Sequence, residues 1–364
     1  MSILDAQLPE RLPLAMLPTP IRRVDPGVLA RLLAANGATA DRSTDELPAV
    51  WIKRDDLTGL LLSGNKVRKL EYALAEARSA GATHVVTCGG LQSNHCRATA
   101  VCCAALGMQA VLLLRMDDPD VEPELQGNVL IDRLVGARVV RFARSQWPER
   151  NAIMQAVADE LSGDGHTPYI VPEGASNAVG ALGYVNCVRE IGLQLAETVG
   201  DGFDTIVVAC GSGGTAAGLD LGLALYPHVA RKLRALAVCD DVDYFRQVCT
   251  NIYQAAVARL GLGGEDGLRD APVVDLDDRF IGAGYAIPYP AMMADLAALA
   301  RATGIVLDPV YSGKAWHGML QTLRDNPSAL GSRVCFIHTG GVYGLFAQGD
   351  HLLPHLPPLE SPRR

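Results

Sequence analysis

Short apolar runs alternate with amphipathic stretches along most of the chain. Four runs rich in β-branched and aliphatic residues predict strands at residues 84–88, 109–115, 138–142 and 167–171. Stretches in which apolar residues recur every three or four positions predict helices at residues 68–80, 95–106, 126–134 and 149–161. This alternation is typical of parallel sheets covered by helices, so the sequence predicts the α/β class.

The alternation restarts after Gly174, which predicts a domain boundary near residues 174–178. The second part of the chain predicts helices at residues 178–198 and 216–225 and strands at residues 205–210 and 233–239. The glycine- and charge-rich segment 261–270 is expected to be a surface loop. The proline-rich tail from Leu352 is expected to be irregular.

Composition narrows the class of protein. The 364 residues are 49% hydrophobic and 20% charged, which is enough for a large core and excludes a disordered chain. A net charge of -8 argues against a nucleic-acid partner, because phosphate backbones require clustered Lys and Arg. No apolar run is long enough for a membrane span, and the first residues lack the pattern of a signal peptide. We therefore expect a cytoplasmic protein.

The cysteines and histidines do not predict a metal site. Nine cysteines are present without a CxxC pair, and no HExxH pattern occurs. Most of the cysteines lie in apolar stretches, where a free thiol behaves as a small hydrophobic group. We expect buried, reduced thiols and no bound metal.

Lys66 is the first candidate for chemistry. It follows Gly64-Asn65 and directly precedes a predicted helix, with Arg68 and Lys69 close by. The positive end of a helix dipole and neighbouring cations both disfavour an ammonium group, so a lowered pKa is expected. A neutral amine is the form that Schiff-base chemistry requires. Spacing alone favours a solvated basic face at a helix start.

A glycine-rich loop, Gly211-Ser212-Gly213-Gly214-Thr215, lies between a predicted strand and a predicted helix. Backbone N–H groups in such a loop can bind a phosphate, and hydroxyl groups add donors. The same loop fits the dinucleotide fingerprint GxGxxA, with Asp240 after the next strand as a ribose ligand. A nicotinamide oxidoreductase is therefore an alternative, although it would leave Lys66 without a role.

A second loop, Gln92-Ser93-Asn94-His95, also joins a predicted strand to a predicted helix. Ser93 or Asn94 can cap the helix. The free N–H groups of the same helix end, with small polar side chains, also suit a substrate α-carboxylate. His95 alone fits a structural role better than a catalytic one.

Together these segments resemble the D-cysteine desulfhydrase and 1-aminocyclopropane-1-carboxylate (ACC) deaminase family of fold-type-II pyridoxal phosphate (PLP) enzymes, which are tryptophan synthase β-like. The resemblance runs from about Leu17 to Gly344. It rests on segments 17–20, 53–56, 64–69, 92–95, 211–215, 284–285, 308–314 and 338–341. It implies two open, mostly parallel sheets flanked by helices. It also implies a small domain, residues 61–175, inserted into a large PLP-binding domain of residues 1–60 and 176–364.

The resemblance also implies roles for individual residues. Lys66 matches the Schiff-base lysine, and Ser93, Tyr285 and Tyr311 match catalytic positions. The cofactor-binding positions are Lys66, Lys69, Asn94, Gly211, Ser212, Gly213, Gly214, Thr215 and Ser312. The substrate-binding positions are Gln92, Ser93, Asn94, His95 and Thr339. Family members are commonly homodimers, so a homodimer acting on a small amino acid is expected.

Two positions favour one branch of the family. The ACC deaminase pattern has Glu after Tyr311 and Leu after His338, whereas this chain has Ser312 and Thr339. A Ser hydroxyl cannot hold the PLP pyridine nitrogen protonated as a carboxylate can, so the ring withdraws electrons more weakly. That favours β-elimination, with D-cysteine as the preferred substrate, over opening of the ACC ring.

The sequence leaves open three further alternatives to the elimination of sulfide from D-cysteine. Ser63 and Glu173 depart from the family pattern and leave open a related β-substituted amino acid such as cysteate. ACC deaminase activity is a second alternative. A PLP-fold protein that only binds a ligand is a third, although an intact Lys66 argues against it.

Overall fold

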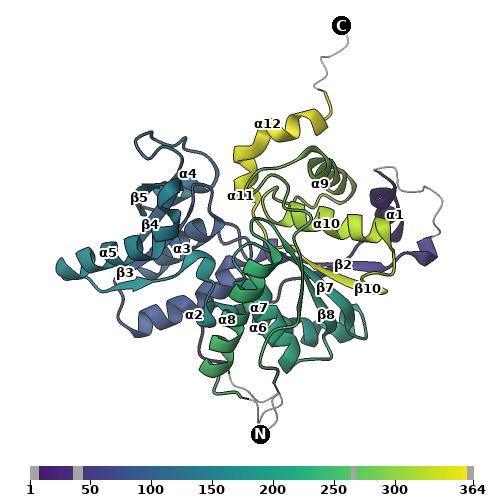
Figure 1. Cartoon of the computed structure of the whole chain (residues 1–364), viewed down its shortest axis with the longest axis horizontal. Helices are drawn as coiled ribbons and strands as arrows, with labels where there is room; N and C mark the ends of the chain where they lie inside the picture. Colours follow the sequence, from purple (N-terminus) through teal and green to yellow (C-terminus); the bar gives the residue numbers. More distant parts are fainter. Residues whose placement is uncertain (1–7, 36–43, 264–267, 359–364) are drawn as a thin grey trace.

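The computed structural model describes residues 8–35, 44–263 and 268–358. They form two open sheets with helices on both faces of each, as predicted from the resemblance (Figure 1). The smaller, four-stranded sheet is built from the first half of the chain and the larger, six-stranded sheet from both ends of it. The division into domains at residues 60 and 175 stays a prediction.

The small sheet is entirely parallel, with the order β5-β4-β3-β6. Its strands are β3 (His84–Gly90), β4 (Gln109–Met116), β5 (Arg138–Ala143) and β6 (Pro168–Ile170). Its helices are α2 (Lys66–Ser79), α3 (Asn94–Leu106), α4 (Gly127–Leu134) and α5 (Arg150–Gly163). Because side chains alternate along a strand, Val86 and Val111 pack in the cluster with α5, and Val85 and Leu112 pack in the cluster with α2 and α3.

The large sheet has the order β1-β2-β10-β7-β8-β9, and only β1 is antiparallel to its neighbour. Its strands are β1 (Ile21–Arg23), β2 (Ala49–Lys53), β7 (Phe203–Cys210), β8 (Ala230–Ala237), β9 (Val274–Asp277) and β10 (Arg333–Ile337). The helices are α1 (Pro26–Ala34), α6 (Ala178–Thr198), α7 (Gly214–Leu225), α8 (Val242–Arg259), α9 (Pro290–Thr303), α10 (Ser312–Asp325), α11 (Val342–Leu345) and α12 (Gly349–Leu352).

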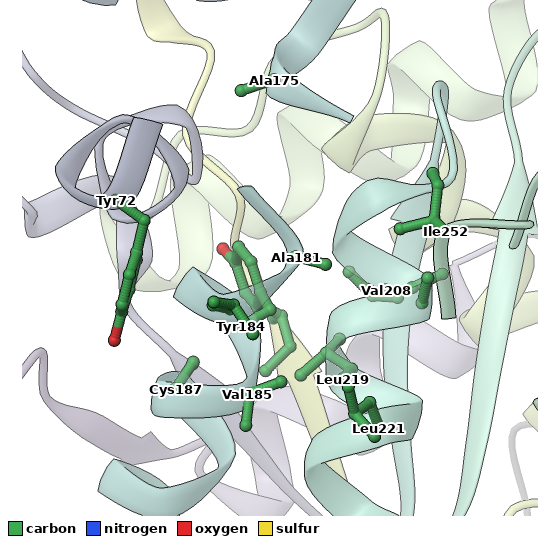
Figure 2. Close-up of a cluster of buried hydrophobic side chains, with 14 of the residues drawn as sticks. Tyr72, Ala175, Ala181, Tyr184, Val185, Cys187, Val208, Leu219, Leu221 and Ile252 are labelled. Atoms are coloured by element: carbon green, nitrogen blue, oxygen red, sulfur yellow. The ribbon is translucent and has the colours of Figure 1, made fainter. Parts of the chain in front are cut away.

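The two faces of the large sheet bury different clusters. One face packs against α1, α9 and α10, and the other against α6, α7 and α8. Figure 2 shows the second cluster, in which Tyr184 of α6 and Leu219 of α7 lie beside Val208 of β7. Gly183 lets α6 approach α2 closely, because a Cβ there would lie 2.3 Å from the Arg68 carbonyl oxygen. The largest apolar cluster thus joins the two sheets through α2 and α6.

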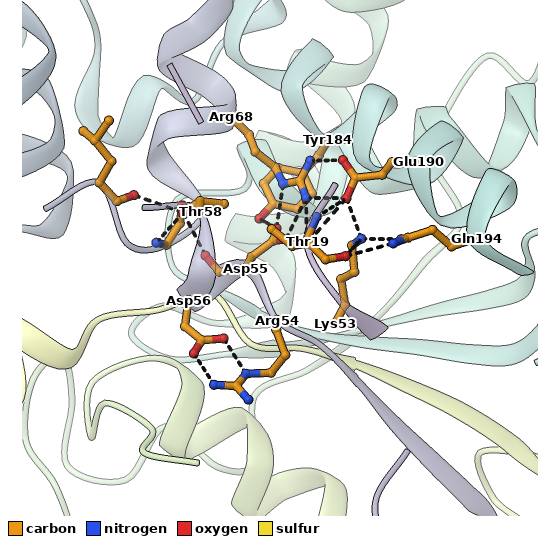
Figure 3. Close-up of polar contacts among 12 residues, drawn as sticks. Thr19, Lys53, Arg54, Asp55, Asp56, Thr58, Arg68, Tyr184, Glu190 and Gln194 are labelled. Atoms are coloured by element: carbon orange, nitrogen blue, oxygen red, sulfur yellow. Dashed lines mark hydrogen bonds and ion pairs between the residues drawn. The ribbon is translucent and has the colours of Figure 1, made fainter. Parts of the chain in front are cut away.

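A buried polar network connects the N-terminal segment, β2, α2 and α6 (Figure 3). Arg68 donates to both oxygens of Asp55, at 2.8 and 2.9 Å, and to both oxygens of Glu190, at 2.9 Å. Tyr184 donates to Asp55 at 2.7 Å, and Lys53 pairs with Glu190 at 2.5 Å. These are charge-assisted hydrogen bonds between buried groups, so they fix the start of α2 against the large sheet.

The predicted elements agree closely with the observed ones. The predicted helix at residues 178–198 is observed with the same ends, and most other boundaries differ by one to three residues. Residues 264–267 of the expected loop and 359–364 of the expected irregular tail lie outside the described residues, and Gly349–Leu352 is helical. All nine cysteines are free, eight of them buried. Within the described ranges, no helix is both long and apolar enough to span a membrane.

Candidate active site

A pocket lies where the carboxyl ends of β3 and β7 approach the start of α2. Such ends of parallel strands commonly form ligand sites. Its lining includes most of the predicted site residues: Lys66, Ser93, Asn94, His95, Gly211, Ser212, Gly213, Thr215, Tyr285, Tyr311 and Thr339. Gln92, Gly214 and Ser312 do not line it but directly adjoin residues that do, and Lys69 lies behind the glycine-rich loop, beside Gly214.

Lys66 is the first residue of α2 and lies inside this pocket. Its backbone position depends on Gly64, which has φ +113° and packs so closely on Thr339 that a Cβ would lie 2.7 Å from the Thr339 carbonyl oxygen. Burial lowers the pKa of Lys66 to about 8, although the charges of Glu173 and Asp308 act in the opposite direction. The amine is therefore partly neutral near physiological pH.

The predicted direction of this pKa shift is confirmed, but the predicted effect of neighbouring cations is not among its causes. Neighbouring cations do not dominate, because the Arg68 guanidinium is neutralised by Asp55 and Glu190 in the buried network. Desolvation, which sequence spacing does not show, has the largest effect on Lys66.

The glycine-rich loop and Lys69 form a cradle for an anion. Gly214 begins α7, and its backbone lies so close to Lys69 that a Cβ would be 2.7 Å from the Lys69 Nζ atom. Lys69 is fully buried and donates to the Ser176 hydroxyl at 2.9 Å, and the Ser176 hydroxyl lies 2.8 Å from that of Ser212. In the described part of the chain, no carboxylate pairs with Lys69.

Burying an ammonium group without a counter-ion costs free energy. Here burial and the charge of Lys66 lower the pKa of Lys69 well below its ordinary value. A phosphate group would supply the missing charge and would also accept hydrogen bonds from the N-terminus of α7. The cradle therefore fits the phosphate of PLP.

The loop before α3 provides a second binding surface in the pocket. Ser93 is the N-cap of α3, and its hydroxyl accepts a hydrogen bond from the Cys96 N–H at 3.2 Å. Asn94 contacts Asn128 at 3.2 Å. Gln92 turns towards α4 instead, where its side chain donates to the Gln126 carbonyl and accepts from the Asn128 N–H. Gln92 therefore positions the loop in this structure rather than lining the pocket.

His95 has a defined tautomer. The Thr87 hydroxyl donates to the Val171 carbonyl at 2.7 Å, so the same oxygen accepts from the His95 Nε2 atom at 2.8 Å. Burial and the charges of Lys66 and Lys69 lower the pKa of His95 well below its ordinary value. The buried Nδ1 atom of a neutral ring, with no protein partner in the described structure, is consequently a hydrogen-bond acceptor. The sequence favoured a structural over a catalytic role for His95, which the Nε2 hydrogen bond fits, and the substrate-binding role implied by the resemblance stays a prediction for this pocket-lining ring.

Two tyrosines close the other side of the pocket. The hydroxyls of Tyr285 and Tyr311 are 2.7 Å apart, and the Lys66 ammonium lies 6.0 Å from the centre of the Tyr311 ring. Burial raises the pKa of Tyr285 to about 12, so its hydroxyl stays protonated at neutral pH. Ser312 is fully buried behind the pocket, where its hydroxyl donates to the Asp308 carboxylate and its N–H donates to the same oxygen.

A second, outer cavity of about 590 Å³ lies beside this pocket and was not predicted from the sequence. The two share Gly90, Glu173, Gly211, Ser212 and Tyr285. Charged and aromatic residues line the outer part, namely Arg115, Trp147, Arg150, Glu173, Asp240 and Tyr244. The position of Arg115 at the carboxyl end of β4 is a signal that could have identified it.

Residues 32–340 match the family described as "Pyridoxal-phosphate dependent enzyme". A bifunctional D-cysteine desulfhydrase/1-aminocyclopropane-1-carboxylate deaminase of Arabidopsis thaliana, described as mitochondrial, is 40% identical over 93% of this chain and 80% of its own length. The chain belongs to this desulfhydrase and deaminase family.

Two further relatives support membership of the desulfhydrase and deaminase family. A D-cysteine desulfhydrase of Yersinia pestis (strain Pestoides F) is 40% identical over 82% of this chain and 88% of its own length. The crystal structure of an ACC deaminase homologue superimposes with a TM-score of 0.82 at 34% identity, covering 97% and 98% of the two chains. The protein is thus a PLP-dependent enzyme, and the nicotinamide oxidoreductase alternative is discarded.

If Lys69 and the glycine-rich loop bind the PLP phosphate, the Lys69→Met substitution should weaken PLP binding specifically. The variant should bind PLP roughly 10- to 100-fold more weakly, because the phosphate loses a charge-assisted hydrogen-bond donor. Affinity for pyridoxal, which lacks the phosphate, should change little. Fluorescence titration of the apoenzyme with both compounds measures the difference, and an equal loss for both would contradict the cradle assignment.

Proposed function

We propose that this enzyme eliminates the β-substituent of a small amino acid, with D-cysteine as its first substrate, to give pyruvate, sulfide and ammonia. One observation supports this above the others. Lys66 is a buried amine with a pKa of about 8, and it shares a pocket with an anion cradle and a polar helix N-terminus. Such an amine is well suited to be both the attachment point of PLP and a general base.

Each part of the pocket has a role in this proposal. Lys66 would hold PLP, with Lys69 and residues 211–215 around its phosphate. When bound, PLP supplies an electron sink for the substrate's Cα. The N-terminus of α3 with Ser93 would bind the substrate carboxylate, since the dipole and free N–H groups favour an anion. Lys66 would take the Cα proton, and Tyr285 with Tyr311 would orient the β-substituent.

The choice between the two activities of the family rests on Ser312 and Thr339. Ser312 donates its hydroxyl hydrogen to Asp308, so it has no proton to share with a ring nitrogen and no charge to hold one there. That supports elimination of a thiol over opening of a cyclopropane ring. ACC deaminase activity is the second candidate, because the Arabidopsis relative carries both names.

The assay for this proposal uses purified enzyme supplied with PLP. D-cysteine should yield pyruvate and sulfide in equal amounts, and ACC should yield little or no 2-oxobutyrate. L-cysteine is the control for chirality. Release of 2-oxobutyrate from ACC at a higher kcat/KM than pyruvate from D-cysteine would overturn the choice of reaction.

The pKa of Lys66 predicts how PLP uptake depends on pH. Only the neutral amine reacts with the aldehyde, so the uptake rate should fall about tenfold per pH unit below pH 8 and level off above it. The rise of visible absorbance after PLP is mixed with apoenzyme measures this rate. A rate that kept rising to pH 10 would mean that Lys66 has an ordinary lysine pKa.

The expected homodimer is part of this proposal and is tested separately, by size-exclusion chromatography with light scattering. A mass of about twice 38.6 kDa is expected.

A further inference from the structure

Arg115 is held beside the catalytic pocket by two aromatic rings. Its guanidinium carbon lies 4.3 Å from the centre of the Trp147 ring and 5.4 Å from that of Tyr285. A Cβ on Gly90 would lie 3.8 Å from the Arg115 Nη2 atom and 3.7 Å from the Tyr285 ring. Since Gly90 and Tyr285 also line the pocket of Lys66, this guanidinium is at the boundary between the inner and outer cavities.

The Arg115 guanidinium makes no direct contact with a carboxylate in the described structure. Neither a hydrogen bond nor an ion pair joins its side chain to another described residue. The nearby carboxylate of Glu173 pairs with Arg150 at 3.5 Å, and Asp240 is exposed on the outer cavity without pairing with Arg115. Two guanidiniums thus lie near one half-buried carboxylate, which is in ion-pair contact with Arg150 only, and the second carboxylate of the cavity, Asp240, is exposed to solvent.

This arrangement favours an anionic ligand group. A guanidinium presents five donors in a planar fork that matches a carboxylate, and stacking on two rings keeps the fork in one orientation. A half-buried cation without an anionic partner is unfavourable unless a ligand supplies the negative charge. The outer cavity of about 590 Å³ has room for a substituent far larger than the thiol of cysteine.

We infer that Arg115 binds a carboxylate at the far end of the substrate's β-substituent, so that the enzyme cleaves S-substituted cysteines with an anionic substituent. The inference rests on the proposed elimination. The α-amino and α-carboxylate groups would stay in the inner pocket with Lys66 and Ser93. The substituent would pass Tyr285 and enter the outer cavity.

The reaction with S-carboxymethylcysteine balances as an elimination followed by hydrolysis. Lys66 takes the Cα proton, the Cβ–S bond breaks, and its electron pair leaves with sulfur as mercaptoacetate. The 2-aminoacrylate that remains takes up one water and gives pyruvate and ammonia. No oxidant or reductant is needed.

A matched pair of substrates tests the inference. S-Carboxymethylcysteine and S-carbamoylmethylcysteine have nearly the same shape and the same leaving atom, but only the first carries a distal charge. Holoenzyme is assayed with both enantiomers of each compound, and D-cysteine is the reference. A kcat/KM for the carboxylate roughly 10- to 100-fold above that for the amide is expected.

Three variants separate binding from general damage. Arg115→Gln should remove the preference for the carboxylate and leave the amide within about threefold. Arg115→Lys keeps the charge but loses the fork, and should retain part of the preference. Arg138→Gln is the matched control, because Arg138 is an exposed arginine at the other end of the small sheet that pairs with Glu160. It should behave like wild type.

A binding measurement gives a second readout. The Lys66→Ala variant, which should not turn the compounds over, is titrated calorimetrically with the same pair, with and without Arg115→Gln. A carboxylate preference that disappears with Arg115 supports the inference. Equal affinities for carboxylate and amide overturn it. If D-cysteine is cleaved but neither S-substituted compound is, the inference fails while the proposed function stands; if none is cleaved, the proposed function itself fails.

Discussion

Replacing Lys66 with alanine is expected to reduce turnover of D-cysteine by about 10⁴-fold, because one side chain serves as attachment point and as base. Lys66→Arg should be equally inactive, since a guanidinium keeps the charge but does not provide a neutral amine. Steady-state assays of pyruvate release measure both.

The control is Lys232→Ala, which removes an exposed lysine from β8 and should leave kcat unchanged. Near wild-type turnover by Lys66→Ala would contradict the assignment of Lys66. Since Lys69 is also buried near the pocket, the absorbance of PLP bound to Lys66→Ala would show whether the cofactor has moved to a different amine.

Asp55→Asn is expected to lower the free energy of unfolding by about 3–5 kcal/mol. Asp55 is fully buried and accepts hydrogen bonds from Thr19, Arg68 and Tyr184, so the amide leaves part of the Arg68 charge uncompensated. Urea denaturation at a fixed PLP concentration measures the change. Glu160→Gln, which breaks an exposed pair with Arg138, should change it by less than about 0.5 kcal/mol.

The pH dependence of this difference has a definite sign. Arg68 and the other donors hold the pKa of Asp55 below 3.8 in the folded protein, despite its burial. The carboxylate therefore stabilises the fold above that value, and this contribution is lost as the pH falls through the lowered pKa. The difference between wild type and Asp55→Asn should narrow in acid. A difference that stayed constant down to the acid transition would mean that the network contributes little through charge.

Local sequence pattern predicts the small sheet well because its strands are continuous apolar runs. The same pattern predicts the large sheet less well at the edge formed by β8 and β9. In β8, Arg231, Lys232 and Arg234 interrupt the apolar run, so the predicted strand begins at residue 233 rather than Ala230. Arg234 is accommodated there by ion pairs with Asp275 and Asp277 of β9. A pairing between distant segments of this kind leaves no periodic signal.

The candidate site was predictable only where its residues have a local signal in the sequence. Lys66, Ser93 and Gly213 each stand beside a helix start, which is a local feature of the sequence. Tyr285 has no such context, and Tyr311 precedes a helix, α10, that the local pattern did not predict, so only the resemblance to a family pointed to these two residues. The neighbours of Arg115 come from separate elements, since Trp147 follows β5 and Tyr285 follows β9. Their association depends on the tertiary fold.

Lys314 shows why burial alone does not identify the reactive amine. Burial lowers its pKa to about 8, as for Lys66. Lys314, however, donates to the carbonyl oxygens of Val238, Ile281 and Gly284 at 2.7 to 3.2 Å, so all three of its hydrogens are used. Lys66 lies in the pocket itself and has no comparable set of acceptors among the described residues.

The most direct test is to reduce the PLP-loaded enzyme with borohydride and locate the modified lysine by peptide mass spectrometry. Reduction makes the lysine–cofactor bond permanent. A single adduct on Lys66, absent from Lys66→Ala, is the predicted result. An adduct on Lys69 or Lys314 with Lys66 unmodified would contradict the assignment of this amine and the mechanism built on it.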